Sequence, residues 1–152
     1  MRKFLKLILS LFIVSTLFAC SKKEEKVVID LDATMESVIA QGETLGIPAT
    51  APLTKEEFCT LFGVNQDDVV AANVTRAMMS AHLNDIIMVE VSDGKISDVK
   101  DAINNFYDNA VLYPFMMEFV ENKQVFESGN YLIVVVAEKS VEIMDFIKEE
   151  IK

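Results

Sequence analysis

The chain has 152 residues, 24 of them acidic and 14 basic, and a formal net charge of −10. This length suits one domain with short additions. Because an acidic surface repels phosphate groups, the charge excludes a role in binding nucleic acid.

The N-terminus has the layout of a secretory signal peptide. Arg2, Lys3 and Lys6 form a basic head, and residues 7–18 are almost entirely apolar. This apolar run is shorter than the roughly 20 residues that a membrane-spanning helix needs. We therefore predict an export signal over residues 1–19. A genuine membrane span is the alternative.

Cys20 ends this apolar run in the sequence Leu17-Phe18-Ala19-Cys20. The pattern resembles the bacterial lipobox, in which the cysteine thiol receives a diacylglycerol and becomes the new N-terminus after cleavage. We predict lipidation at Cys20 and attachment to the outer face of the cell membrane. Ordinary cleavage or an uncleaved anchor remain as alternatives.

Residues 20–26 then form a lipidated cysteine with a charged tether, and residues 27–152 form a single domain. Removing residues 1–19 takes away three basic and no acidic residues, so the net charge falls from −10 to −13. At about 3.5 Å per residue the stretch from Ser21 to Lys26 reaches roughly 20 Å. Cys59 is then the only free thiol, so an internal disulfide is excluded.

Two short helices are predicted at the start of the domain. In the first, over residues 27–41, apolar residues lie on one face and Asp32 serves as the cap. An irregular linker with two prolines follows over residues 46–52. In the second helix, Thr54 to Glu57 forms a capping box, and Phe58, Leu61 and Phe62 face inward.

The rest of the domain alternates strands with helices. Two strands are predicted, one with Val70, Ala72, Val74 and Met78 on one face and one over residues 86–91. A long helix begins at Ser97 and ends or kinks at Pro114. A hairpin joins residues 124–127 to residues 131–137, and a last helix covers residues 140–151.

These elements indicate an α+β fold. An antiparallel sheet of about four strands, made of paired hairpins, is covered by helices. Residues 132–136 are apolar on both faces, so we place this strand centrally and expect Val134 to be buried.

Three segments carry a resemblance to a known family: "LTKEEFCTLFGVNQDDV", "NDIIMVEVSDGKISDVKDAI" and "VENKQVFESGNYLIVVVAE". Together they resemble the uncharacterised small lipoproteins of clostridia and related Gram-positive bacteria, catalogued as a domain of unknown function. The resemblance covers Leu53 to about Glu138. It implies a fold and an envelope location, and it supplies no catalytic residues.

Candidate catalytic and metal-binding residues each have a simpler structural interpretation. Cys59 and the single histidine, His82, would have to meet for nucleophilic catalysis, but Cys59 lies on a short amphipathic helix and His82 in a turn. Methionines near His82, together with Met88 and the Met116-Met117 pair, suggest a Cu(I) site, although core packing explains them better.

Asn65, Asp67 and Asp68 resemble the start of a calcium loop, but Val70 stands where glycine is needed. Helix capping by the aspartates or a solvated turn is the better interpretation. The sequence predicts no cofactor and no metal.

The segment Tyr113 to Val120, "YPFMMEFV", carries too many large apolar residues for one buried face. Partial exposure would make a patch of the kind that contacts partners, with Tyr113 and Phe115 as its anchors. A loop packed over the core is the alternative.

These observations favour a membrane-anchored, non-enzymatic binding module whose partner is another envelope protein. A small envelope hydrolase with paired carboxylates and a small-solute receptor are the two alternatives.

Overall fold

The computed structural model of the protein describes residues 28–152. The predicted signal peptide, Cys20 and the charged tether lie outside these residues. Within the described part, one five-stranded sheet and six α-helices form an α+β fold. The fold class is therefore confirmed, and the expected number of strands is one too low.

Every pair of neighbouring strands in the sheet is antiparallel, and the order is β1-β2-β3-β5-β4. The strands are β1 (Thr50–Leu53), β2 (Val69–Ala77), β3 (Asn84–Val91), β4 (Gln124–Ser128) and β5 (Tyr131–Ala137). The helices are α2 (Leu31–Ala40), α3 (Gly42–Leu45), α4 (Lys55–Phe62), α5 (Ile96–Asp108), α6 (Pro114–Glu121) and α7 (Ser140–Glu150).

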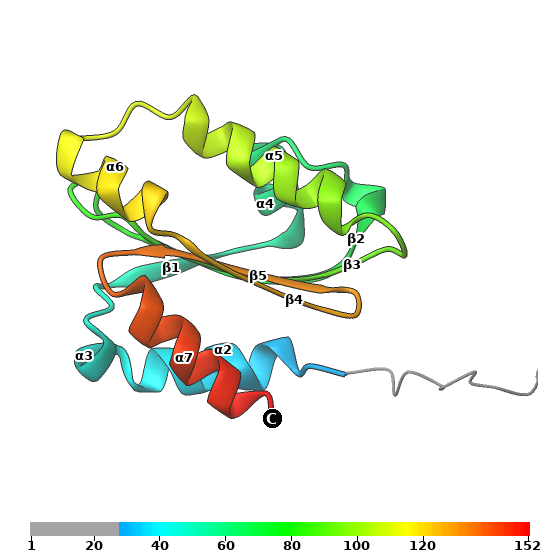
Figure 1. Cartoon of the computed structure of the whole chain (residues 1–152), viewed down its shortest axis with the longest axis horizontal. Coiled ribbons are helices and arrows are strands. Elements are labelled where there is room, and N and C mark those ends of the chain that lie inside the picture. The colour runs from blue at the N-terminus through cyan, green and yellow to red at the C-terminus, as the bar shows by residue number, and fades with distance from the viewer. Residues whose placement is uncertain (1–27) are drawn as a thin grey trace, which may run out of the picture.

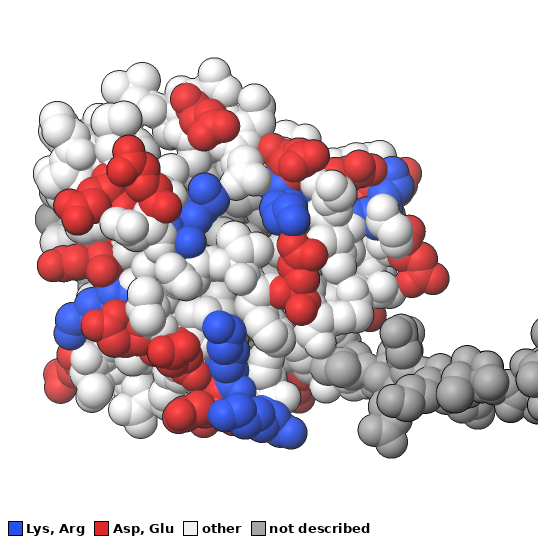
Figure 2. Space-filling view, in the orientation of Figure 1, with Lys and Arg blue, Asp and Glu red and all other residues white. Residues whose placement is uncertain are grey.

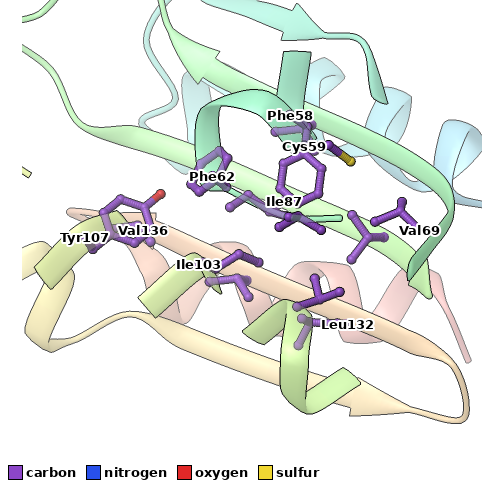
Figure 3. Packing of buried hydrophobic residues seen from close by; sticks show 14 of the residues in the cluster. Phe58, Cys59, Phe62, Val69, Ile87, Ile103, Tyr107, Leu132 and Val136 are labelled. Carbon is purple, nitrogen blue, oxygen red and sulfur yellow. The ribbon is translucent and has the colours of Figure 1, made fainter. Parts of the chain in front are cut away.

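Helices cover both faces of the sheet, which gives three layers (Figure 1). On one face α4, α5 and α6 pack over a cluster that includes Phe58, Ile87, Ile103 and Leu132, several of whose members Figure 3 shows at close range. On the other face α2 and α7 cover a second cluster around Met88. This arrangement explains why β3 and β5 are apolar on both faces, because each face of these strands is removed from water.

The hairpin of β4 and β5 and the burial of Val134 are as predicted. Val134 is 1% exposed and lies between Ile87 of β3 and Val125 of β4. Strand β5 is thus paired on both sides, although β3 is the middle strand of the five.

The fifth strand, β1, comes from the segment predicted to be an irregular linker. Its residues pair with β2, and Pro52 lies opposite Thr75. Proline is tolerated here because β1 is an edge strand, where one side of the backbone needs no hydrogen-bonded neighbour. Pro52 therefore marks a sheet edge, whereas Pro48 lies before the strand.

The long helix is shorter than predicted. Helix α5 ends at Asp108, and Pro114 begins a separate helix, α6, as its first residue. Proline suits this first position because its missing N–H has no partner within the helix. Ser97 is not the cap of α5, which starts at Ile96 without a side-chain cap.

Local details of three other elements also differ. Asp30, not Asp32, caps α2 by accepting a hydrogen bond from the Ala33 backbone N–H at 3.0 Å. In α4 the capping box is confirmed, but Leu61 is 39% exposed and Cys59 faces the core in its place.

Strand β2 contains a bulge between Val69 and Ala71, so Val70 turns outward and is 56% exposed. Such a bulge inserts one extra residue and breaks the alternation of faces. Met78 follows the end of β2 and is also exposed. Over residues 28–152, no helix is long and apolar enough to cross a membrane.

Candidate functional site

Cys59 and His82 lie in different surroundings. Cys59 is 2% exposed within the core cluster of α4, whereas His82 is exposed in the turn between β2 and β3. Burial raises the pKa of the Cys59 thiol, which keeps it protonated and a poor nucleophile. No hydrogen bond joins the two side chains, so the structure does not assemble the relay that nucleophilic catalysis needs.

The methionines do not converge on one point. Met88 is buried under α2 and α7, whereas Met116 is buried on the opposite face of the sheet. Met78 and Met79 are 67% and 60% exposed in the turn beside His82. Within residues 28–152, no group of three or more His, Cys, Asp or Glu side chains is arranged to hold a metal ion.

The segment that resembles the start of a calcium loop is a capped turn. The Asn65 side chain accepts a hydrogen bond from the Asp67 backbone N–H at 3.1 Å and caps a short 3₁₀ helix. Asp68 lies 3.6 Å from the Lys95 ammonium. Capping is confirmed, although Asn65 and not an aspartate supplies it.

The segment from Tyr113 to Val120 is the helix α6 and its cap, not a loop. Met116 is buried, while Tyr113 and Phe115 are 56% and 53% exposed. Their rings stack at a centroid distance of 5.9 Å, and Phe119 meets Phe115 edge to face at 6.1 Å. One face of α6 therefore enters the core, and the other presents aromatic side chains to solvent.

The exposed face of α6 adjoins the turn between β2 and β3. This turn carries Met78, Met79 and His82, and residues of both segments line one pocket. We call the exposed face of α6, this turn and the pocket between them the α6 end of the domain. It lies at the left of Figure 1, where α3 and the start of α7 also lie.

The pocket at the α6 end has a volume of about 480 Å³, within the range of small-molecule sites. It collects side chains from four segments of the chain. The residues that matter for its chemistry are His82, Asn84, Phe115, Glu118, Phe119 and Glu138. Apolar rings therefore lie beside two carboxylates and an amide.

Asn84 is the unusual member of this set. Its residue is 4% exposed, and its side-chain Oδ1 is buried without a hydrogen-bond donor from the protein. A buried acceptor left without a donor costs about 1–3 kcal/mol. Most buried polar groups in proteins are hydrogen-bonded, so this acceptor is an exception, and because the atom itself is buried it does not open into the pocket.

The surroundings of the pocket are acidic. Glu118 and Glu138 are exposed, and neither forms an ion pair with a lysine or arginine of residues 28–152. Figure 2 shows red acidic groups gathered over the left end of this face, where α6 lies. The Lys139 side chain lies against Gly46, with its ammonium 3.5 Å from the Thr44 carbonyl oxygen.

A buried polar network involves Asp85, the neighbour of Asn84 in β3, on the face of the sheet that α5 covers. Asp85 is 1% exposed, accepts a hydrogen bond from the Tyr107 hydroxyl at 2.7 Å and pairs with Arg76 at 3.0 Å. Burial and the Asp85 carboxylate raise the pKa of Tyr107 well above its ordinary value. The hydroxyl therefore stays protonated and donates to Asp85. The Arg76 guanidinium also lies over the rings of Phe62 and Phe106.

The pocket was not predicted from the sequence, although one signal for it exists. Asn84 and Asp85 are two polar residues at the start of a strand whose next four residues are apolar. Polar residues that enter a wholly buried strand need partners. Their partners depend on how helices such as α5 and α6 pack on the sheet, and the local sequence does not specify this packing.

Comparison with known proteins identifies a family. No curated protein and no solved structure matches the chain. A family profile described as a domain of unknown function, DUF4358, matches residues 44–137. The match spans the complete sheet and helices α4 to α6, including most residues of the pocket. The chain therefore belongs to the DUF4358 family, as the resemblance to a family of unknown function implied.

Proposed function

We propose that this protein is an exported, lipid-anchored binding module that contacts another envelope protein through its α6 end. The anchor would be Cys20, which lies outside the described residues, and the domain would stay on the outer face of the cell membrane. The proposed contact residues are Tyr113 and Phe115.

The observation that carries this proposal is the stacked pair of exposed rings. Monomeric soluble proteins rarely leave aromatic side chains gathered at the surface without a use, and aromatic anchors supply much of the binding energy at protein interfaces. Tyr113 and Phe115 are already held against each other at 5.9 Å. Binding therefore costs them little side-chain entropy.

The position of this surface fits a protein partner. Helix α2, where the described chain begins, starts at the end of the domain opposite α6 (Figure 1). A tether of roughly 20 Å from the lipid would keep that opposite end near the bilayer. The α6 end is then the part of the domain best placed to meet a partner away from its own anchor.

The alternative of a hydrolase with paired carboxylates receives less support. Such an enzyme needs one carboxyl group that stays protonated at neutral pH, which burial in an apolar site usually provides. Glu118 and Glu138 share a pocket, but both are exposed to solvent. The arrangement suits charge recognition better than proton transfer.

The first prediction concerns the anchor. Mass spectrometry of the membrane-extracted protein should find a diacylglycerol-modified peptide that begins at Cys20, because the apolar run ends in the Leu-Phe-Ala-Cys pattern. Cys20→Ala should release or mislocalise the protein, whereas Cys59→Ala should leave its location unchanged. An unmodified Cys20 in membrane-extracted protein would show that the anchor is wrong.

The second prediction tests the contact. Replacing Tyr113 and Phe115 together by serine should weaken capture of the envelope partner at least tenfold, since two aromatic anchors are lost. Capture is measured with the full chain in detergent-solubilised membranes, and then with the purified partner. The midpoint of thermal unfolding should stay nearly unchanged because both rings are more than half exposed.

A matched control separates contact from general loss of apolar surface. Val70 and Val141 are 56% and 51% exposed and lie on other elements. Replacing these two valines by serine should leave capture unchanged. Equal losses in both double variants, or no loss in either, would contradict the proposed contact.

A further inference from the structure

The open edge of strand β4 carries an inference that goes beyond the contact at the α6 end. We propose that two copies of this chain pair through β4 in antiparallel orientation, so that their sheets join into one continuous sheet. In this pairing Val125 of one copy lies opposite Val125 of the other. The state of the edge, its charge pattern and the side of the sheet on which the chain begins all fit a second copy.

Strand β4 is an outer strand of the sheet and has a neighbour on one side alone. Its register with β5 is unbroken, and it contains no proline. The opposite outer strand, β1, contains Pro52, and β2 beside it contains a bulge. Prolines and bulges are devices that keep a sheet edge from pairing with another chain. Strand β4 has neither of them.

The backbone of β4 is oriented for pairing. A two-residue turn at residues 129–130 joins Ser128 to Tyr131, and the pair that closes such a turn is hydrogen-bonded. Hydrogen-bonded and non-hydrogen-bonded pairs alternate along an antiparallel ladder. Val125 and Glu127 therefore direct their backbone N–H and C=O groups away from β5, to the open edge. A second β4 strand centred on Val125 would satisfy these groups.

The side chains along this edge match their own reverse. Lys123, immediately before the strand, shares one face of the sheet with Val125 and Glu127. In an antiparallel pair centred on Val125, Lys123 of each copy lies opposite Glu127 of the other. Lys123 forms no ion pair within residues 28–152, and the Glu127 side chain is 40% exposed beside Lys100. Opposite charges directly across two strands stabilise their pairing.

The two neighbouring registers match less well. A pair centred on Phe126 places Glu127 opposite Val125, which leaves the charges without partners. A pair centred on Glu127 brings two carboxylates together, and like charges directly opposite are destabilising. Figure 2 shows blue basic and red acidic groups beside uncharged surface along the middle of this face, at the height of β4 in Figure 1. Charge therefore selects the register centred on Val125.

The symmetry of this pairing agrees with two anchored chains. A two-fold axis that relates antiparallel edge strands stands perpendicular to the sheet, so the same helical layer of both copies lies on the same side. Helix α2, where the described chain begins, lies in the layer that it shares with α7 (Figure 1). Both tethers would then leave from one side of the joined sheet. Two lipid anchors in one membrane require this, an agreement that rests on the anchor proposed above.

Sedimentation equilibrium of the full-length chain in density-matched detergent tests the pairing. The parent should show a concentration-dependent equilibrium between monomer and dimer. Lys123→Glu should raise the dimer dissociation constant at least tenfold, because two attractive pairs become repulsive. Adding Glu127→Lys to this variant should reverse most of the loss, since the opposite charges are then exchanged. Glu56→Lys changes an exposed residue of α4, which packs at the other edge of the sheet, and should leave the constant unchanged.

Cysteine cross-linking in membranes tests the register. Val125→Cys should give a disulfide-linked dimer on mild oxidation, because Cα atoms of a hydrogen-bonded pair lie about 5.5 Å apart, within the span of a disulfide. Val141→Cys, on α7 and 51% exposed, should not. Cys59 is 2% exposed, so the parent protein supplies the background.

Three outcomes would overturn the inference. One is a parent chain that stays monomeric at every concentration. Another is an equal effect of Lys123→Glu and Glu56→Lys, which would show general charge repulsion between copies. The third is cross-linking of Val125→Cys to a different protein without any dimer, which would assign the β4 edge to another partner.

Discussion

Val134→Asp is expected to cost several kcal/mol of folding free energy and to unfold much of the population at room temperature. The side chain is 1% exposed between Ile87 and Val125, in a strand whose two neighbours leave no water to reach it. A carboxylate placed there has no cationic partner, and an unpaired buried charge is among the most destabilising changes known. Small domains have a total stability of only about 5–15 kcal/mol.

Val141→Asp is the matched control for this experiment. Val141 is 51% exposed on α7, so the same change should shift the free energy of unfolding by less than about 1 kcal/mol. Urea denaturation followed by circular dichroism measures both variants. A Val134→Asp protein that unfolds at the parent's urea concentration would show that β5 is not an interior strand.

Asp85→Ala should be the second large effect, with a loss of about 3 kcal/mol. The substitution removes a 2% exposed carboxylate, and it leaves the buried Tyr107 hydroxyl without its acceptor and Arg76 without its ion-pair partner. The loss of folding free energy comes mainly from Tyr107 and Arg76, which lose their hydrogen-bond acceptor. A buried polar group without a hydrogen bond has given up its interaction with water without a replacement.

Asp98→Ala provides the comparison with an exposed ion pair. Asp98 lies 2.8 Å from the Lys95 ammonium, but its side chain is 60% exposed. Surface pairs of this kind contribute little, so a loss below about 1 kcal/mol is expected. Urea denaturation measures the free energy of unfolding of both variants. Similar decreases for Asp85→Ala and Asp98→Ala would show that burial does not strengthen the Asp85 interactions.

The same network predicts a response to alkaline pH. In the folded protein the pKa of Tyr107 is raised, chiefly by burial and then by Asp85. The unfolded chain ionises this hydroxyl near pH 10, whereas the folded protein keeps it protonated. The contribution of Tyr107 to stability is thus present below about pH 10 and is lost as the pH rises further. Tyr107→Phe should lose less stability than the parent between pH 9 and pH 11.

Several parts of the fold could be predicted because their signals are local. The capping box at Thr54, the hairpin around Gly129 and the doubly apolar run around Val134 each depend on residues close in sequence. Turn and cap geometry follow from backbone preferences of a few residues. The family was also accessible, since its recognisable segments are these same local features.

Other parts could not be predicted from local patterns. Strand β1 exists because β2 offers it a hydrogen-bonding edge, and the exposure of Val70 follows from a bulge that only strand pairing defines. The long helix predicted to end or kink at Pro114 stops at Asp108, because the helical spacing of apolar residues continues past its true end and does not locate it. Pairing over long sequence distances decides such features.

The sequence by itself determined the α+β class, the family and the residues expected to be core. The reason is that side-chain type and spacing determine which residues prefer burial and which favour turns. It also predicted the anchor at Cys20 and the aromatic surplus at Tyr113 and Phe115. Only the tertiary structure decided that those rings are exposed at α6, and that Phe115 lines one pocket with His82 and Glu138. The physical reason is that a pocket forms where elements distant in sequence pack against one sheet, and their packing depends on the whole core.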